Sequence, residues 1–207
     1  DVLIGTDEMG PPPVLAQIRS AGVPVEMFSS QPDLITLHAT LKHLGRLLGD
    51  ELQAEQLFTD YQHQLALHTQ QVARIQAQNK APGVLLLLGH AGGKPLVAGK
   101  DTAADWLLTQ AGGHNLATHT GYKPFSIEAL AGLNPEVLVF ADRSLTGEAA
   151  RQALMKENPI LASIRAAKDG RVYELDPTLL VGGLGPRLPT SLKQLTADFY
   201  PAASVNP

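Results

Sequence analysis

The sequence predicts an α/β protein made of two lobes with mainly parallel sheets, joined by one long backbone helix. Residues 51–81 contain no glycine and no proline, which over so long a run indicates a single continuous helix. Phe58 and Tyr61 begin a series of apolar residues at steps of three and four, which share one face of that helix. Strand–helix patterns flank the run on both sides. We therefore expect a first lobe over residues 1–50, a linking helix over 51–81 and a second lobe over 82–207.

The first lobe is expected to hold a β-α-β-α unit. Residues 1–5 are expected to form an apolar strand that leads into a polar turn. A helix over residues 11–20 follows, because its opening prolines suit the first turn of a helix, where an N–H group has no partner. The alternation of side chains over 23–28 predicts a second strand, and leucines at helical spacing predict a helix over 34–48.

The long helix is expected to start after Asp50, an N-capping residue, and to end before Pro82-Gly83. The unbroken apolar run 84–88 then predicts a strand buried on both faces, as in parallel sheets. Thr102, three residues before Asp105, predicts the start of a helix. The remaining elements are expected to be a short strand over 96–98, a helix up to 111, a loop over 114–124, a helix capped by Ser126, a strand over 137–140, helices over 149–155 and 159–166, a strand over 172–175 and a terminal helix over 188–199.

Composition excludes several classes of function. A net charge of -4 leaves no basic surface for nucleic acid. The absence of cysteine excludes disulfides, thiolate zinc sites and cysteine nucleophiles. The longest apolar run, 84–88, is too short to cross a bilayer. The chain opens directly on a strand, so we expect it to be a fragment or a processed product.

The loops that follow the strands are the places to search for a site, because α/β proteins bind ligands there. The Gly-rich loop 89–93 lacks the spacing of a phosphate-binding loop. A small α/β enzyme that uses His90 or His119 as a base is one alternative, but no carboxylate or nucleophile is placed beside either histidine. Ser126 is expected to cap a helix and lies in no GxSxG turn, so no catalytic triad is predicted.

Three stretches carry a resemblance to a known family. They are DVLIGTDEMGPPPVLAQI at residues 1–18, HAGGKPLVAGKDTAADWLLTQAGGHNL at 90–116 and TGYKPFSIEALAGLNPEVLVF at 120–140. The chain resembles the helical-backbone substrate-binding proteins of ABC importers, and specifically the periplasmic haem-binding proteins of Gram-negative haem uptake systems. AGKDTAADWLL and GYKPFSIEAL point to the haem branch. The resemblance implies two lobes joined by a rigid helix, with the ligand held in the cleft between them.

The resemblance also implies that the N-terminal part of the first lobe is missing from this chain. In the family that part includes a tyrosine that is the axial ligand of the haem iron. None of the four tyrosines of this chain matches its position, so the metal ligand is unknown and is expected upstream of Asp1. Tyr61 on the long helix and Tyr173 on a strand are expected to be structural.

The ligand-binding residues that the resemblance implies lie on the second lobe. His90 follows its first strand and resembles a position where some family members offer a second iron ligand. Tyr122 and Lys123 lie on the next loop, where an aromatic face and a cation suit a planar macrocycle with two carboxylates. Arg143 follows the strand that ends near Phe140 and resembles an arginine that covers the haem edge; a solvated arginine of a turn is the equal alternative.

On these grounds we expect a periplasmic protein, not an enzyme, that captures haem and delivers it to an inner-membrane ABC permease dimer. It is expected to be a monomer, to depend only indirectly on an outer-membrane receptor system and to bind no nucleic acid. The nearest alternative keeps the fold and changes the ligand to a ferric siderophore or cobalamin. The family presents one carboxylate on each lobe to permease arginines, and Glu8 and Glu157 are the candidates for this docking pair.

Overall fold

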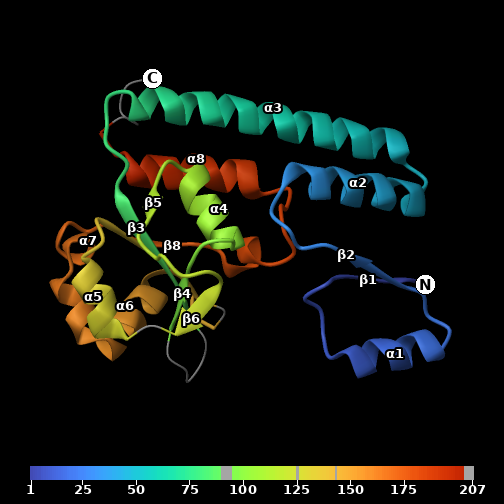
Figure 1. The fold of residues 1–207 in the computed structure, drawn as a ribbon, viewed down its shortest axis with the longest axis horizontal. Coiled ribbons are helices and arrows are strands. Elements are labelled where there is room, and N and C mark those ends of the chain that lie inside the picture. The colour runs from blue at the N-terminus through green and yellow to red at the C-terminus, as the bar shows by residue number, and fades with distance from the viewer. Residues whose placement is uncertain (90–94, 125, 143, 203–207) are drawn as a thin grey trace.

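The computed structural model describes residues 1–89, 95–124, 126–142 and 144–202. The protein is an α/β structure of two lobes, and the long helix α3, Glu51–Gln76, runs along both of them (Figure 1). The first lobe precedes this helix in the sequence and the second lobe follows it. The predicted architecture, two α/β lobes joined by one long helix, is confirmed.

The first lobe contains two parallel strands, β1 (Leu3–Thr6) and β2 (Val25–Phe28), whose last residues face each other. The helices α1 (Pro12–Ser20) and α2 (Leu34–Leu48) follow the two strands. The predicted β-α-β-α unit is therefore confirmed. Because the strands are parallel, both of the turns that follow them lie at the same edge of the sheet.

The long helix begins where predicted and ends earlier than predicted. Asp50 caps its start, since the carboxylate accepts a backbone N–H of the first turn at 3.1 Å. Its end at Gln76 precedes the predicted end at Ala81. The Asn79 side-chain amide donates to the Ile75 carbonyl at 2.9 Å, in place of the helix bond that the backbone N–H of Asn79 would make. The Gln78 N–H also donates to the Ile75 carbonyl, at 3.1 Å, in a tighter turn than that of an α-helix. The absence of glycine and proline therefore marked the longest possible helix and not its actual end.

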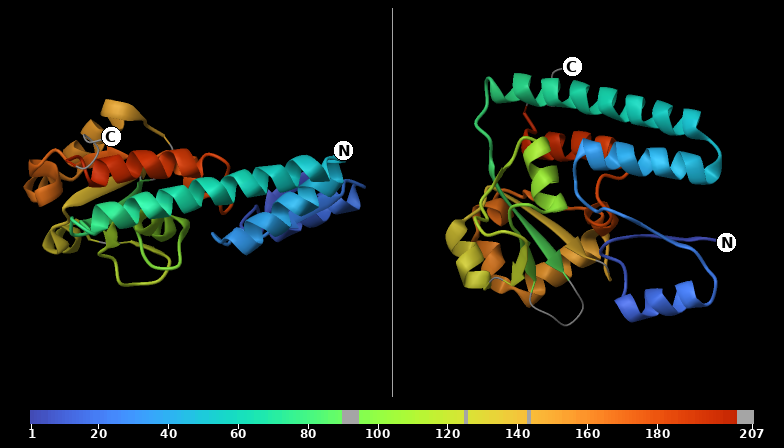
Figure 2. Two further views of the ribbon diagram at one scale, coloured as in Figure 1. Left: turned by 90° about the horizontal axis from the view of Figure 1, so that it is seen from above. Right: turned by 45° about the vertical axis from the view of Figure 1, so that its right-hand side comes forward.

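One face of α3 is buried, as its periodicity predicted; the buried residues are Ala54, Phe58, Tyr61, Leu65, His68 and Val72. The first half of the helix packs on α2, where a Cβ on Gly45 would come within 2.8 Å of the Ala54 Cβ. The second half packs on the terminal helix α8, Leu188–Phe199 (Figure 2). The helix α3 thus connects the lobes through a continuous packing surface.

The second lobe is built on one mixed sheet. Its strands are β3 (Gly83–Gly89), β4 (Leu96–Ala98), β5 (His114–Asn115), β6 (Tyr122–Pro124), β7 (Val137–Asp142) and β8 (Val172–Glu174). Their order is β6-β4-β3-β7-β8, and β5 also pairs with β3. The pairs of β3 with β5 and β7, and of β7 with β8, are parallel, whereas β4 is antiparallel to both β3 and β6. The sheet is therefore mainly parallel, as predicted, with one antiparallel edge.

Helices cover both faces of this sheet (Figure 1). They are α4 (Ala103–Gln110), α5 (Ile127–Leu133), α6 (Gly147–Glu157), α7 (Arg165–Lys168) and α8, with 3₁₀ turns at Pro159–Ser163 and Pro177–Leu180. Thr102 caps α4 by accepting the Asp105 N–H at 3.1 Å, and Ser126 caps α5 by accepting the Ala129 N–H at 3.1 Å. Both caps were predicted from the sequence, and both are confirmed.

Two segments of the second lobe differ from the sequence prediction. The segment 159–166 is a 3₁₀ turn followed by α7, because Ile164 between them is extended, with φ -72° and ψ 155°. The segment 114–124 is not one loop, since it contains β5 and β6. The Lys100 N–H donates to the His119 carbonyl at 2.7 Å and ties the middle of this segment to the residues just after β4. Neither β5 nor β6 contains an aliphatic residue, so they lack the apolar signal that revealed the equally short strands β4 and β8.

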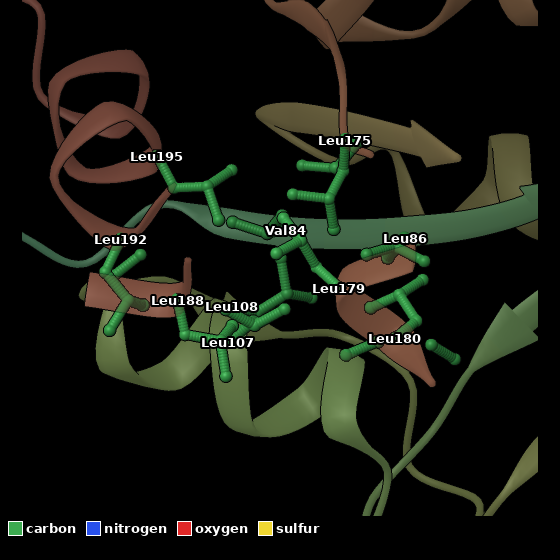
Figure 3. Close-up of a cluster of buried hydrophobic side chains, with 14 of the residues drawn as sticks. Val84, Leu86, Leu107, Leu108, Leu175, Leu179, Leu180, Leu188, Leu192 and Leu195 are labelled. Atoms are coloured by element: carbon green, nitrogen blue, oxygen red, sulfur yellow. The ribbon is translucent and has the colours of Figure 1, made fainter. Parts of the chain in front are cut away.

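The core of the second lobe lies on both faces of β3. Val84 and Leu86 belong to a cluster with leucines of α4, α8 and the 3₁₀ turn Pro177–Leu180 (Figure 3). Leu85 and Leu87 belong to a second cluster, which includes residues of α5 and α6. All four side chains are at most 1% exposed, so the predicted burial of this strand on both faces is confirmed.

The C-terminal end of α4 is held by side chains that come from α3 and from the end of α8. The last carbonyls of a helix lack partners within it. The Gln110 carbonyl lies 3.2 Å from His68 Nε2. The Ala111 carbonyl accepts a hydrogen bond from the Thr196 hydroxyl at 3.1 Å, and the Gly112 carbonyl accepts one from the Tyr200 hydroxyl at 2.6 Å. Burial lowers the pKa of His68, which favours the neutral ring. These contacts fix the second half of α3 to the second lobe.

Candidate functional site

Turns from both lobes meet where the strands of the first lobe end. The first lobe contributes Glu8, in the turn after β1, and residues 30–32, in the turn after β2. The second lobe contributes residues 101–103 at the start of α4, Tyr122 of β6 and Gly182. Together they enclose a cavity of about 200 Å³, which we call the junction cavity. Because its walls belong to different lobes, its size depends on how the lobes are placed relative to each other.

A hydrogen bond joins the two first-lobe turns at this cavity. Asp7 Oδ1 accepts the Ser30 N–H at 3.0 Å, and the Asp7 N–H donates to the Phe28 carbonyl at 2.8 Å. Hydrogen bonding to Ser30, first through its side chain and also through its backbone N–H, lowers the pKa of Asp7, so the charged carboxylate is favoured. The turn that carries Glu8 and the turn that carries Ser30 are therefore linked to each other.

Tyr122 approaches the junction cavity from the second lobe. It lies on β6 opposite Ala98 of β4, and its hydroxyl is buried without a hydrogen bond to the described residues. Burial raises the pKa of Tyr122 and the charge of Glu8 raises it further, although polar groups at the start of α4 oppose the shift. Tyr122 and Glu8 thus line the same cavity from opposite lobes.

Tyr122 and Lys123 do not share a face, although both were predicted to lie on one loop. They are neighbours on β6, and successive side chains of a strand point to opposite faces. Lys123 pairs with Val97 in the sheet and is exposed. One ligand can contact both side chains only if it extends past the edge formed by β6.

His90 and Arg143 lie outside the described residues, so their roles stay predictions. The strands that precede them are neighbours in the sheet, and Gly89 at the end of β3 is paired with Asp142 at the end of β7. Gly89 and Asp142 therefore lie side by side at the carboxyl edge of the sheet. Ligands of α/β proteins bind at such an edge.

Glu157 is exposed at the end of α6 and borders a second cavity of about 490 Å³. This cavity is lined by second-lobe residues such as Leu87, Phe140 and Leu154. Movement of one lobe against the other leaves a cavity of this kind unchanged. The junction cavity is therefore the better candidate for a site that opens and closes. Glu8 and Glu157 lie on different lobes, which is the arrangement that the docking prediction requires.

Within the described ranges, no group of three or more His, Cys, Asp or Glu side chains could hold a metal ion. The helices in the described part of the chain include none that is long and apolar enough to cross a membrane. Tyr61 is buried on α3, Tyr173 lies on β8, and Tyr200 donates to the Gly112 carbonyl. These three tyrosines are parts of the fold, as was expected for Tyr61 and Tyr173.

The sequence reasoning missed three residues at the junction. Gly182 and Gly183 line the junction cavity with φ of 79° each, and Asp7 links the two first-lobe turns. The run Gly-Gly-Leu-Gly at 182–185 is the signal that could have drawn attention to the glycines, because such pairs mark left-handed backbone or close contacts. Asp7 was grouped with the polar turn after β1, and no local pattern distinguishes it there.

A sequence model of the family described as Periplasmic binding protein matches residues 1–179. Among curated proteins, the chain is similar to the uncharacterized ABC transporter substrate-binding lipoprotein YvrC of Bacillus subtilis, with 25% identity over 190 residues. That match covers 90% of this chain and 57% of YvrC. The chain therefore spans little more than half the length of this curated relative.

Several solved structures are similar over nearly the whole chain. A periplasmic heme-binding protein from Pseudomonas aeruginosa is 58% identical with a TM-score of 0.95, and the match covers 98% of this chain and 72% of that one. The periplasmic heme-binding protein RhuT from Roseiflexus sp. RS-1 is 34% identical with a TM-score of 0.85, covering 98% and 76% of the two chains. The periplasmic heme-binding protein HutB of Vibrio cholerae is 32% identical with a TM-score of 0.78, covering 96% and 76%.

Proposed function

The chain belongs to the periplasmic binding protein family, and from that premise we propose that it captures haem in the periplasm and delivers it to an ABC permease of the inner membrane. The observation that carries the proposal is the likeness of nearly the whole chain to three periplasmic heme-binding proteins. A binding protein has no reaction to catalyse; it must hold its ligand and then release it. The alternative of a small enzyme with a loop histidine is set aside, because the family is one of binding proteins.

In this proposal haem lies between the lobes, next to the junction cavity. That cavity of about 200 Å³ is smaller than the roughly 300–1,000 Å³ of most ligand pockets, so haem needs space beyond the described walls. The ring of Tyr122 would supply an apolar wall, and His90 a second iron ligand. Glu8 and Asp101 place negative charge at the cavity, so the propionates of haem should point away from it, towards the cations Lys123 and Arg143.

The position of α3 supports a release step in which the lobes tilt by a small angle. The helix packs on α2 with its first half and on α8 with its second half. A helix that packs on both lobes resists bending. The lobes would therefore tilt apart as two rigid units, each held by one half of α3. A small separation is enough to weaken contacts that a ligand makes with both walls at once.

Hemin titrated into the intact protein should give a saturable Soret band with the spectrum of high-spin, oxygen-ligated ferric iron. The control is a titration with a ferric siderophore and with cobalamin under the same conditions, since these are the alternative ligands for the fold. Binding of either control ligand, together with no Soret change on adding hemin, would contradict the haem proposal and leave the family assignment intact.

We further propose that the protein docks on the permease dimer as a monomer, with Glu8 and Glu157 contacting permease arginines. Both carboxylates are exposed, and each belongs to a different lobe. Exposed ion pairs contribute only about 0.2–1 kcal/mol each. Such pairs therefore set the orientation and the association rate more than the affinity.

Glu157→Lys should slow hemin uptake into vesicles that contain the permease by up to about fivefold, the factor that 1 kcal/mol gives. Hemin affinity is measured in parallel, because Glu157 lines the second cavity together with Gly89 and Asp142, which precede His90 and Arg143. A docking role predicts slower uptake at unchanged affinity. Glu128→Lys is the matched control, since it makes the same charge change at an exposed position on α5. Equal uptake by wild type and both variants would exclude Glu157 from docking. Glu8→Lys is a less specific test, because Glu8 also borders the junction cavity.

A further inference from the structure

A glycine pair of the second lobe, Gly182 and Gly183, touches the backbone of the first lobe. A Cβ on Gly183 would lie 3.2 Å from the Ser30 carbonyl oxygen and 3.3 Å from that of Gln31. A Cβ on Gly182 would lie 3.4 Å from Thr6 Cγ2. Both glycines have φ of 79°, a left-handed conformation that favours glycine. At Gly183 the second lobe therefore rests on the first through bare backbone.

The first-lobe side of this contact is held in place. The Ser30 N–H donates to Asp7 at 3.0 Å, which ties the turn after β2 to the turn after β1. Further along the same turn, Asp33 caps α2 by accepting a backbone N–H at 2.8 Å. The Ser30 carbonyl therefore belongs to a turn that is fixed at both ends, and it has little freedom to move away from Gly183.

The glycine pair lies between a packed region and the junction cavity. On one side, Leu180 and Leu184 belong to the same buried cluster as Leu37 of α2 and Phe58 of α3. On the other side, the glycine pair lines the junction cavity. The lobes are thus joined by apolar packing near α3 and are separated by a cavity elsewhere. The glycine contact lies where these two regions meet.

We propose that Gly183 is the backbone contact between the two lobes at the edge of the junction cavity, and that its missing side chain sets how closely the lobes approach there when the protein holds its ligand. Gly183 is in this sense a positioning residue, because it acts on the ligand through the spacing of the lobes. The inference rests on the proposed binding of haem between the lobes. A side chain at Gly183 would hold the lobes apart, and a ligand contacted from both sides would then dissociate faster.

The test compares Gly183→Ala with Gly170→Ala. Gly170 is also left-handed, with φ of 68°, but a Cβ there would meet nothing within 4 Å, so this control has the backbone strain without the contact. We expect Gly183→Ala to release hemin to an apoprotein acceptor about tenfold faster than wild type, a change equivalent to about 1.4 kcal/mol. Gly170→Ala should release hemin at the wild-type rate.

A second readout of the lobe spacing needs no ligand. Trp106, the single tryptophan of the chain, lines a groove at the junction together with Gln31 and Pro32 of the first lobe. Wider spacing should expose Trp106 to more water and shift its fluorescence to longer wavelength in Gly183→Ala, but not in Gly170→Ala. If both variants match wild type in fluorescence and in hemin release, the inference is wrong.

The experiments distinguish an error about the Gly183 contact from an error about haem binding. A wild-type protein that binds no hemin contradicts the proposed function, whereas the fluorescence comparison still tests the lobe contact. If Gly183→Ala does not fold, Asp7→Ala tests the same contact, because it frees the Ser30 turn and should speed hemin release. Asp7→Asn keeps an acceptor oxygen and should restore the wild-type rate. Equal release rates in the two Asp7 variants would then overturn the inference.

Discussion

Replacing Gln64 with proline is expected to lower the free energy of unfolding by about 3 kcal/mol or more. Gln64 is exposed in the interior of α3, where a backbone N–H donates to the carbonyl four residues before it. Proline has no N–H, and its ring clashes with that carbonyl. Denaturation by urea measures the loss directly, and the exposed side chain of Gln64 adds no packing change of its own.

The same substitution should also weaken hemin binding, because the two halves of α3 hold different lobes. The first half packs on α2, and the second half packs on α8 and carries His68, which contacts α4. A kink at Gln64 changes the angle between these halves and therefore between the walls of the junction cavity. Gln64→Ala keeps the N–H and is the matched control, with wild-type stability and affinity expected. A proline variant that is unchanged in both would contradict the role of α3 as the connection between the lobes.

The parts of the fold that could be predicted from the sequence depend on long, regular patterns. The buried face of α3 and the burial of β3 on both faces each extend over enough residues to be unambiguous. By contrast, β5 and β6 contain no aliphatic residue and acquire their strand geometry by pairing with β3 and β4. The end of α3 was missed as well, because the local hydrogen bonds of Gln78 and Asn79 with the Ile75 carbonyl leave no signal in the sequence.

The sequence indicated where to search for a candidate site, but not the geometry found there. The order of strands and helices indicates that loops after strands carry the ligand, and Glu8 and Tyr122 do reach a cavity between the lobes. The opposite orientation of Tyr122 and Lys123 could not be foreseen while their segment was taken for a loop. The contact of Gly183 with Ser30 joins residues far apart in the sequence, so no local pattern reveals it.

Haem as the ligand could not be derived from the chemistry of the residues. The described residues include no group of three or more His, Cys, Asp or Glu side chains that could hold a metal ion, and the charges at the junction cavity are carboxylates. The expectation of haem came from the resemblance of three stretches to a family, and the similarity to solved heme-binding proteins supports it independently of the cavity. Residue chemistry instead predicts how haem would be oriented, with its propionates away from Glu8 and Asp101.

Leu107→Ala is expected to lower the free energy of unfolding by about 2–5 kcal/mol. Leu107 of α4 is fully buried, in the cluster that also contains Leu108, Leu188 and Val84 (Figure 3). The substitution leaves a cavity where α4 packs against α8 and β3. Leu133→Ala is the control, since Leu133 of α5 is 40% exposed and its truncation removes less buried area. Equal losses in the two variants would contradict the central position of Leu107 in the core.

The loss at Leu107 should affect stability and leave the site intact, although α4 begins at the junction cavity. The first turn of α4 is held by Thr102, and its last carbonyls are held by side chains that include His68 and Thr196. The substitution therefore loosens the middle of a helix whose two ends stay fixed. Hemin at roughly 100 times its dissociation constant should then add about 2.7 kcal/mol to the free energy of unfolding of wild type and Leu107→Ala alike. A smaller gain in the variant would mean that Leu107 shapes the binding site itself.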